Sequence, residues 1–166
     1  GVTVPEDLAA FVSTAREDRI RHTYGRGYRD IVRGFHGDFG PAPDAVAEPT
    51  SEAEITALLR WATEASIAVV PYGGGTSVVG GVECAPDDGA GYAGVVSLDV
   101  RAMDAVLEVD AHSRSARIQA GATGPQIREQ LAEDDLQLRH YPQSYEFSTL
   151  GGWIATRAGG HFATLY

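Results

Sequence analysis

The feature that most constrains this chain is a glycine-rich loop, PYGGGTSVVGG, at residues 71–81. Its three consecutive glycines, Gly73 to Gly75, can take positive φ angles and bring successive N–H groups onto one anion. Thr76 and Ser77 add hydroxyl donors. Taken alone, the loop is equally consistent with a glycine-rich turn between strands.

The loop follows a predicted helix and a predicted strand. A capping box from Ser51 to Glu54, followed by an apolar face, predicts a helix over residues 51–65. A β-branched run at 67–70 predicts a buried strand. We also expect short strands at 44–48 and 95–99, a hairpin of 105–109 and 116–120, and a helix opening at Thr123. The predicted class is therefore α+β with short strands.

The charge composition restricts the kind of anion site and the partners. The chain has no lysine, and its 13 basic residues, all arginine, face 23 acidic residues, which gives a net charge of −10. A Walker A loop needs lysine, and the spacing is not GxGxxG, so amides and hydroxyls would have to hold a phosphate. The negative charge disfavours nucleic acids and anionic membranes as the main partner.

Cysteine usage and hydropathy favour a cytoplasmic protein. Cys84 is the only cysteine, which excludes an intrachain disulfide and a cysteine-based metal site. The five histidines show no metal-binding spacing. No apolar run reaches the roughly 18 residues of a membrane span. We therefore expect a cytoplasmic location, no metal and no membrane span.

The first 43 residues are predicted to form a separate region. A capping box from Thr3 to Glu6, with apolar residues at helical spacing, predicts a helix over 5–17. Residues 16–33 are rich in arginines, which either pair with the acidic remainder or bind phosphate. A Gly/Pro connector over 34–43 follows. We expect domains at 1–43 and 44–166, with the folded core beginning at 44.

A second segment, residues 143–159, is also rich in small and hydroxyl residues. Its hydroxyl donors are Ser144, Ser148, Thr149 and Thr156. Arg157 adds a permanent cation, and the glycines at 151–152 permit close approach, either to a ligand or within a packed helix or turn against Trp153. Two such segments point to an extended ligand such as a dinucleotide.

Five motifs, in this order, resemble the PCMH-type FAD-binding domain of the vanillyl-alcohol-oxidase family. They are PDAVAEP (43–49), PYGGGTSVVGG (71–81), VVSLD (95–99), AGATG (120–124) and YEFSTLGGWIATRAGG (145–160). Within the family, the alkylglycerone-phosphate synthase branch is the most similar. The resemblance implies an α+β fold of short-stranded sheets with flanking helices. Because the chain stops at Tyr166 without a tail-like sequence, we expect this domain to be incomplete at its C-terminal end.

The resemblance implies non-covalent FAD with its pyrophosphate on the glycine loop. In members that bind FAD covalently, a histidine stands where this chain has Gly75, and glycine cannot form the bond. Gln143 and Gly159 depart from the Asp and Ser that are usual in the synthases. The residues implied to bind FAD are Pro71, Tyr72, Gly73, Gly74, Gly75, Thr76, Ser77, Gln143, Ser144, Ser148, Thr149, Gly151, Gly152, Thr156, Arg157, Ala158 and Gly159.

The resemblance also implies that this chain is the N-terminal part of an FAD-dependent enzyme. The reaction would be oxidation of an alcohol or a 2-hydroxy acid such as D-lactate or glycolate, or a synthase-like exchange on a glycerone-phosphate ester. The implied partner is that small-molecule substrate, and a homodimer is left open. No catalytic residue is assigned, because substrate contacts in the family come largely from later parts of the chain. The alternative is a non-catalytic nucleotide-binding or interaction module.

Overall fold

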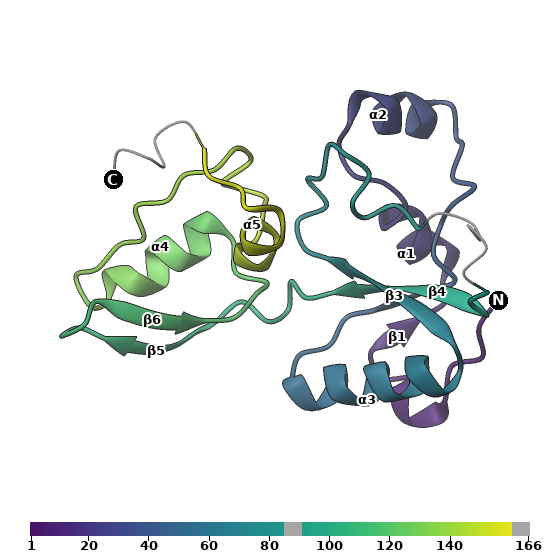
Figure 1. The fold of residues 1–166 in the computed structure, drawn as a ribbon, viewed down its shortest axis with the longest axis horizontal. Helices are drawn as coiled ribbons and strands as arrows, with labels where there is room; N and C mark the ends of the chain where they lie inside the picture. Colours follow the sequence, from purple (N-terminus) through teal and green to yellow (C-terminus); the bar gives the residue numbers. More distant parts are fainter. Residues whose placement is uncertain (85–90, 161–166) are drawn as a thin grey trace.

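The computed structural model describes residues 1–84 and 91–160, which form two lobes (Figure 1). The first lobe holds η1 (Glu6–Leu8), β1 (Val12–Ser13), α1 (Arg16–Arg21), α2 (Tyr28–Phe35), β2 (Ala45–Ala47), α3 (Glu52–Glu64), β3 (Ile67–Tyr72) and β4 (Gly94–Asp99). The second lobe holds β5 (Val106–Asp110), β6 (Ser115–Ile118), α4 (Gly124–Ala132) and α5 (Leu150–Thr156). Short-stranded sheets with flanking helices confirm the predicted fold class. In these residue ranges, no helix has the length and apolar character to cross a bilayer.

The sheet of the first lobe has the strand order β1-β2-β4-β3. Strands β2, β4 and β3 run parallel, and β1 is antiparallel to β2. Helices α1 and α3 lie on opposite sides of this sheet (Figure 1). The register pairs Tyr72, the last residue of β3, with Asp99, the last residue of β4. Ligands of parallel sheets bind beyond the carboxyl ends of the strands, and the glycine loop begins at this edge.

Each lobe has its own hydrophobic core. In the first lobe, Leu58 of α3 and Val96 of β4 are completely buried, and Leu8 of η1 packs with them. In the second lobe, Ile127 of α4 packs against Trp153 of α5. The junction between the lobes is therefore made by other contacts, which include those of the glycine loop.

Most elements predicted from the sequence are confirmed. The helix predicted over 51–65 is α3, and its N-cap Ser51 accepts a hydrogen bond from the N–H of Glu54 (3.3 Å). The predicted strands at 44–48, 67–70 and 95–99 are β2, β3 and β4, and the predicted hairpin is β5–β6. Thr123 precedes α4, and its N–H donates to Oε1 of Gln126 (2.8 Å).

The helix predicted over residues 5–17 is wrong. The chain there forms the 3-10 turn η1 and the strand β1, and α1 starts only at Arg16. Val12 pairs with Ala47 of β2, and both Val12 and Leu8 are buried. Sheet pairing outweighs the local helical pattern, so these side chains reach the core from a strand and a turn. The core thus includes residues before 44, whereas the domain boundary at 43 stays a prediction.

We expect Leu58→Ala to lower the free energy of unfolding by about 2–5 kcal/mol, because it leaves a cavity in the core of the first lobe. Leu107→Ala in β5 is the matched control. Leu107 is 44% exposed, so its loss should stay near about 0.5 kcal/mol. Urea unfolding followed by circular dichroism measures both variants, and equal losses would contradict the placement of Leu58 in the core.

Candidate functional site

The glycine loop of the first lobe lies directly against residues 147–149 of the second. A Cβ added to Gly74 would meet the carbonyl oxygen of Phe147, and a Cβ added to Gly73 would meet the side chain of Thr149. The approach is too close for any side chain, so both positions need glycine. The fold therefore brings together the two segments that the sequence singled out.

In the first part of the glycine loop, the backbone amides have no partner among the described residues. Within the described part of the chain, the N–H groups of residues 73–77 donate no hydrogen bond. Gly75 takes a φ of +64°, the left-handed conformation found in backbone nests that bind anions. The N–H of Arg26 donates to the carbonyl of Ser77 (2.6 Å) and fixes the far end of the loop. Residues 73–77 therefore form a cradle that can accept an anion.

Thr149 places a hydroxyl at the same junction. Its side chain is 1% exposed, and Oγ1 has no hydrogen-bond partner among the described residues. Thr149 is the N-cap of α5, but the first amides of that helix are already used: Leu150 donates to Ala122 (2.9 Å) and Gly151 donates to Ala120 (2.8 Å). An orphaned buried hydroxyl beside free amides fits a ligand that carries acceptor oxygens.

The other predicted residues of 143–159 mainly hold this segment together. Ser148 Oγ donates to the carbonyl of Ser144 (2.8 Å) and accepts from Nε1 of Trp153 (2.7 Å). A Cβ on Gly151 would lie 2.9 Å from the Cβ of Ala120, so this glycine allows helix packing. The exposed members are Gln143, Ser144, Thr156 and Arg157, and the half-exposed ones are Gly152, Ala158 and Gly159. Their contact with a ligand stays a prediction.

Tyr72 fills the space beside Gly75. A Cβ on Gly75 would meet the Oη and Cζ atoms of Tyr72, and the positive φ would strain any side chain there. Tyr72 packs on the ring of His22 with ring centroids 4.4 Å apart, and its Oη donates to the carbonyl of Arg21 (3.4 Å). Position 75 therefore has no room for a side chain.

A buried ion-pair network lies beside Tyr72, and the sequence analysis missed it. Nδ1 of His22 lies 2.8 Å from the carbonyl oxygen of Asp18, and Nε2 lies 2.8 Å from Oδ2 of Asp99. The ring of His22 therefore lies between the carbonyl of Asp18 and the carboxylate of Asp99. Arg101 donates from Nε (2.9 Å) and Nη2 (2.5 Å) to the same Asp99 oxygen. One sequence signal could have indicated this network: Asp99 stands at the end of the strand predicted over 95–99.

Asp99 stays ionised in this network. Burial alone would raise the pKa of its carboxyl, but hydrogen bonds from His22 and Arg101 outweigh burial and hold the pKa below its usual value. Glu48 offers a further ligand atom within 4.8 Å of those of His22 and Asp99. Both oxygens of Asp99 already accept hydrogen bonds from Arg101, whose positive charge balances the carboxylate.

Half of the six arginines in residues 16–33 form ion pairs with acidic residues. Arg21 pairs with Glu17 (2.5 Å), and Arg29 (3.2 Å) and Arg33 (3.0 Å) both pair with Glu83. For Arg21, Arg29 and Arg33, the structure therefore agrees with the interpretation that the arginines of this segment pair with acidic residues.

Family comparison connects this geometry to a cofactor. Residues 43–166 match the family described as FAD binding domain. The chain belongs to this FAD-binding domain family. The match confirms the family predicted from the sequence and supports FAD as the cofactor of this domain.

Relatives of this FAD-binding domain are longer proteins. The alkyldihydroxyacetonephosphate synthase of Dictyostelium discoideum is 39% identical over 148 residues, which cover 89% of this chain and 24% of that protein. The mitochondrial D-lactate dehydrogenase [cytochrome] of Arabidopsis thaliana is 30% identical over 170 residues, covering 98% and 27%. A solved structure of an alkyldihydroxyacetonephosphate synthase superimposes with a TM-score of 0.89 at 37% identity, covering 96% of this chain and 29% of that one. The chain thus spans about a quarter of the length of these relatives.

Asp99→Asn tests the buried network of this FAD-binding domain. The substitution leaves Arg101 without its counter-charge, so we expect the free energy of unfolding to fall by about 3–5 kcal/mol at neutral pH. Because the folded pKa of Asp99 lies below the unfolded one, its contribution is present above about pH 4 and is lost as the pH falls through the folded pKa. Urea unfolding of both proteins at neutral and acidic pH measures this. A difference that persists undiminished in acid would contradict the assignment.

Proposed function

We propose that this protein is the FAD-binding part of a flavin-dependent oxidoreductase or alkylglycerone-phosphate synthase-like enzyme and that it binds FAD non-covalently. The observation that carries the proposal is the run of partnerless amides at residues 73–77 beside the orphaned hydroxyl of Thr149. Consecutive backbone N–H groups can hold a pyrophosphate without lysine, which this chain lacks.

Each part of the cradle would contribute differently. The amides of 73–77 would donate to the phosphate oxygens, and Thr149 would donate its hydroxyl to one of them. Gly73 and Gly74 carry no side chain, so the loop can lie directly against residues 147–149, which brings Thr149 beside the free amides. When bound, FAD supplies electron transfer at its isoalloxazine ring. The protein residues described here bind and orient the cofactor through its phosphates.

Non-covalent binding is supported by the Tyr72–Gly75 contact. Glycine offers no nucleophilic atom, and the Tyr72 ring occupies the place where a side chain at position 75 would start. The covalent attachment that the family makes through this position therefore has neither a reacting atom nor space.

The substrate class follows from the relatives. We infer a small organic acid or phosphate ester, because one relative is named as an alkyldihydroxyacetonephosphate synthase and another as a D-lactate dehydrogenase. The higher identity to the synthase, 39% against 30%, favours a glycerone-phosphate ester. The alternatives, a 2-hydroxy-acid dehydrogenase and a non-catalytic nucleotide-binding module, are distinguished by turnover assays with D-lactate and glycolate. The cytoplasmic location and the homodimer stay predictions.

Thr149→Val separates FAD binding from folding. The variant keeps the shape of the side chain but removes the hydroxyl, which has no partner in the protein itself. We expect unchanged or slightly higher thermal stability and roughly tenfold weaker FAD binding, the value of one hydrogen bond to a charged group. Flavin fluorescence titration measures the affinity. Thr63→Val is the matched control, because the Thr63 hydroxyl donates to the carbonyl of Leu59 (2.8 Å) on the exposed face of α3. Equal FAD affinity in both variants would contradict the proposed role.

Acid denaturation tests the mode of attachment. After FAD-loaded protein is precipitated with acid, we expect all flavin absorbance in the supernatant, because position 75 has no side chain to hold it. A yellow pellet that stays fluorescent after gel separation would show a covalent bond and overturn this part of the proposal.

A further inference from the structure

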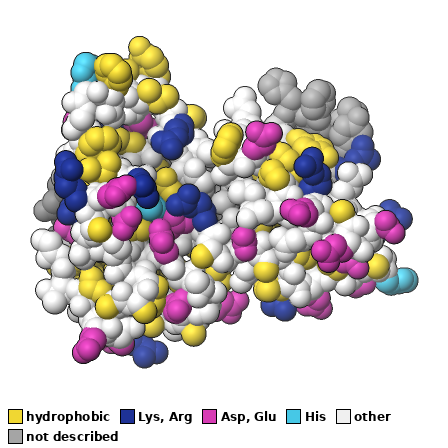
Figure 2. All heavy atoms as spheres, turned by 180° about the vertical axis from the view of Figure 1, so that it is seen from behind, with side chains coloured by type: hydrophobic (Ala, Val, Ile, Leu, Met, Phe, Trp, Pro, Cys, Tyr) yellow, Lys and Arg dark blue, Asp and Glu magenta, His cyan; other side chains and the backbone are white. Residues whose placement is uncertain are grey.

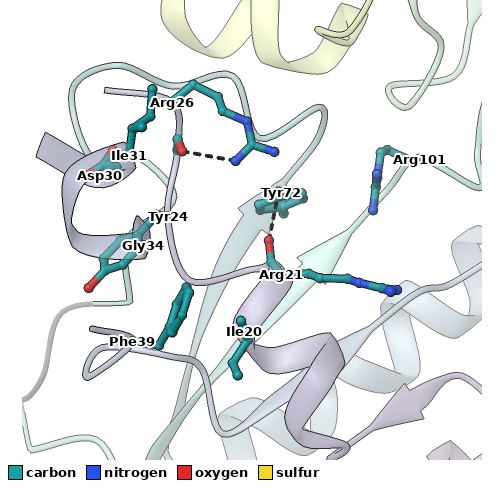
Figure 3. Close-up of a pocket in the computed structure, with 11 residues that line it drawn as sticks. Ile20, Arg21, Tyr24, Arg26, Asp30, Ile31, Gly34, Phe39, Tyr72 and Arg101 are labelled. Carbon is teal, nitrogen blue, oxygen red and sulfur yellow. Dashed lines mark hydrogen bonds between the residues drawn. The ribbon is translucent and has the colours of Figure 1, made fainter. Parts of the chain in front are cut away.

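A separate cavity of about 590 Å³ opens beside the glycine loop, between β3 and the arginine-rich segment (Figure 3). Its volume lies within the roughly 300–1,000 Å³ of small-molecule sites. Ile20, Phe39 and Tyr72 are among the side chains that line it. The cavity therefore combines the size of a ligand site with partly apolar walls.

Three arginines line this cavity, two from the arginine-rich segment and one that follows β4. Arg21, Arg26 and Arg101 lie around the ring of Tyr72 (Figure 3). The Cζ atom of Arg101 is 5.6 Å from the centre of that ring. On the outer surface, dark blue side chains gather on the first lobe toward its junction with the second (Figure 2). This concentration of positive charge stands out in a protein whose net charge is −10.

The positive charge of the cavity is only partly neutralised. The guanidinium of Arg26 makes a single 3.4 Å contact with a carbonyl and has no acidic partner among the described residues. Arg101 is paired with Asp99, yet its side chain stays 51% exposed and can also reach a ligand. Among the described residues that line the cavity, the acidic one is Asp30, and it already pairs with Arg33 of its own helix α2. An added anion would therefore be attracted to Arg26 and Arg101.

The cavity is built on a fixed backbone. A Cβ on Gly25 would meet the carbonyl of Ser77, and the N–H of Arg26 donates to that same oxygen (2.6 Å). This contact holds Arg26 beside the glycine loop. Both arginines act on Tyr72: burial raises the pKa of its phenol, and the charges of Arg101 and Arg26 oppose that rise.

We propose that this cavity binds an organic phosphate through Arg26 and Arg101, with the carbon skeleton against Ile20, Phe39 and Tyr72. Arginine suits this chemistry because its planar guanidinium donates two parallel hydrogen bonds to phosphate oxygens. The phosphate has two sources: a separate phosphate monoester, or the pyrophosphate of FAD reaching over from the adjacent loop. The first source does not depend on FAD binding.

Calorimetric titration with glycerol 3-phosphate at constant ionic strength tests the proposal. We expect saturable binding to the wild type and about tenfold weaker binding to Arg26→Gln, which loses the charged donors. Arg60→Gln is the matched control, because Arg60 is exposed on α3 and the charge change is identical. It should bind like the wild type. Arg101 is not the residue to change, because its loss would also disturb the buried Asp99.

Repeating the titration with FAD present distinguishes the two sources. Unchanged binding supports a separate phosphate monoester. Competition by FAD, together with weaker FAD binding by Arg26→Gln, supports the site and assigns it to the phosphates of FAD. Absence of saturable binding to the wild type, with and without FAD, overturns the proposal. Equal weakening in Arg26→Gln and Arg60→Gln overturns it as well, since it would reflect overall charge alone.

Discussion

The contact between the glycine loop and Phe147 holds the site together. Two lobes with separate cores meet where Gly74 lies against the Phe147 carbonyl, closer than any Cβ would allow. The same approach sets Thr149 beside Gly73, so free amides and an unpaired hydroxyl face one junction. Without it, the first lobe would present only a glycine turn, and α5 would present an ordinary helix start.

The parallel strands β3 and β4 determine which charged side chains lie beside this junction. Because β3 and β4 end at one edge, Tyr72 and Asp99 become neighbours, and His22 and Arg101 gather on the Asp99 carboxylate. Tyr72 packs on His22 of this network and against Gly75. Arg26, which has no acidic partner among the described residues, adds a positive charge near the loop. An acidic protein without lysine can thus present positive charge locally where a phosphate would bind.

The local elements could be predicted wherever capping and periodicity agreed with the tertiary contacts. Helix α3 has its Ser51 cap and an apolar face, and the hairpin β5–β6 has alternating faces. The segment at 5–17 has similar helical spacing, yet Val12 pairs with β2 instead. Sheet partners lie far away in the chain, so a short window of sequence does not contain the competing interaction.

For the site, the residues themselves already indicated that a lysine-free glycine loop could hold an anion only with amides and hydroxyls, and the ordered motifs pointed to the family. They did not show which hydroxyl is available. Ser148 and Thr149 are adjacent and chemically alike, but Ser148 is bonded to Ser144 and Trp153 while Thr149 has no partner among the described residues. The tertiary fold made that choice, and it also set Arg26 beside the loop. Such differences arise because hydrogen bonding depends on which distant backbone groups come within reach after folding.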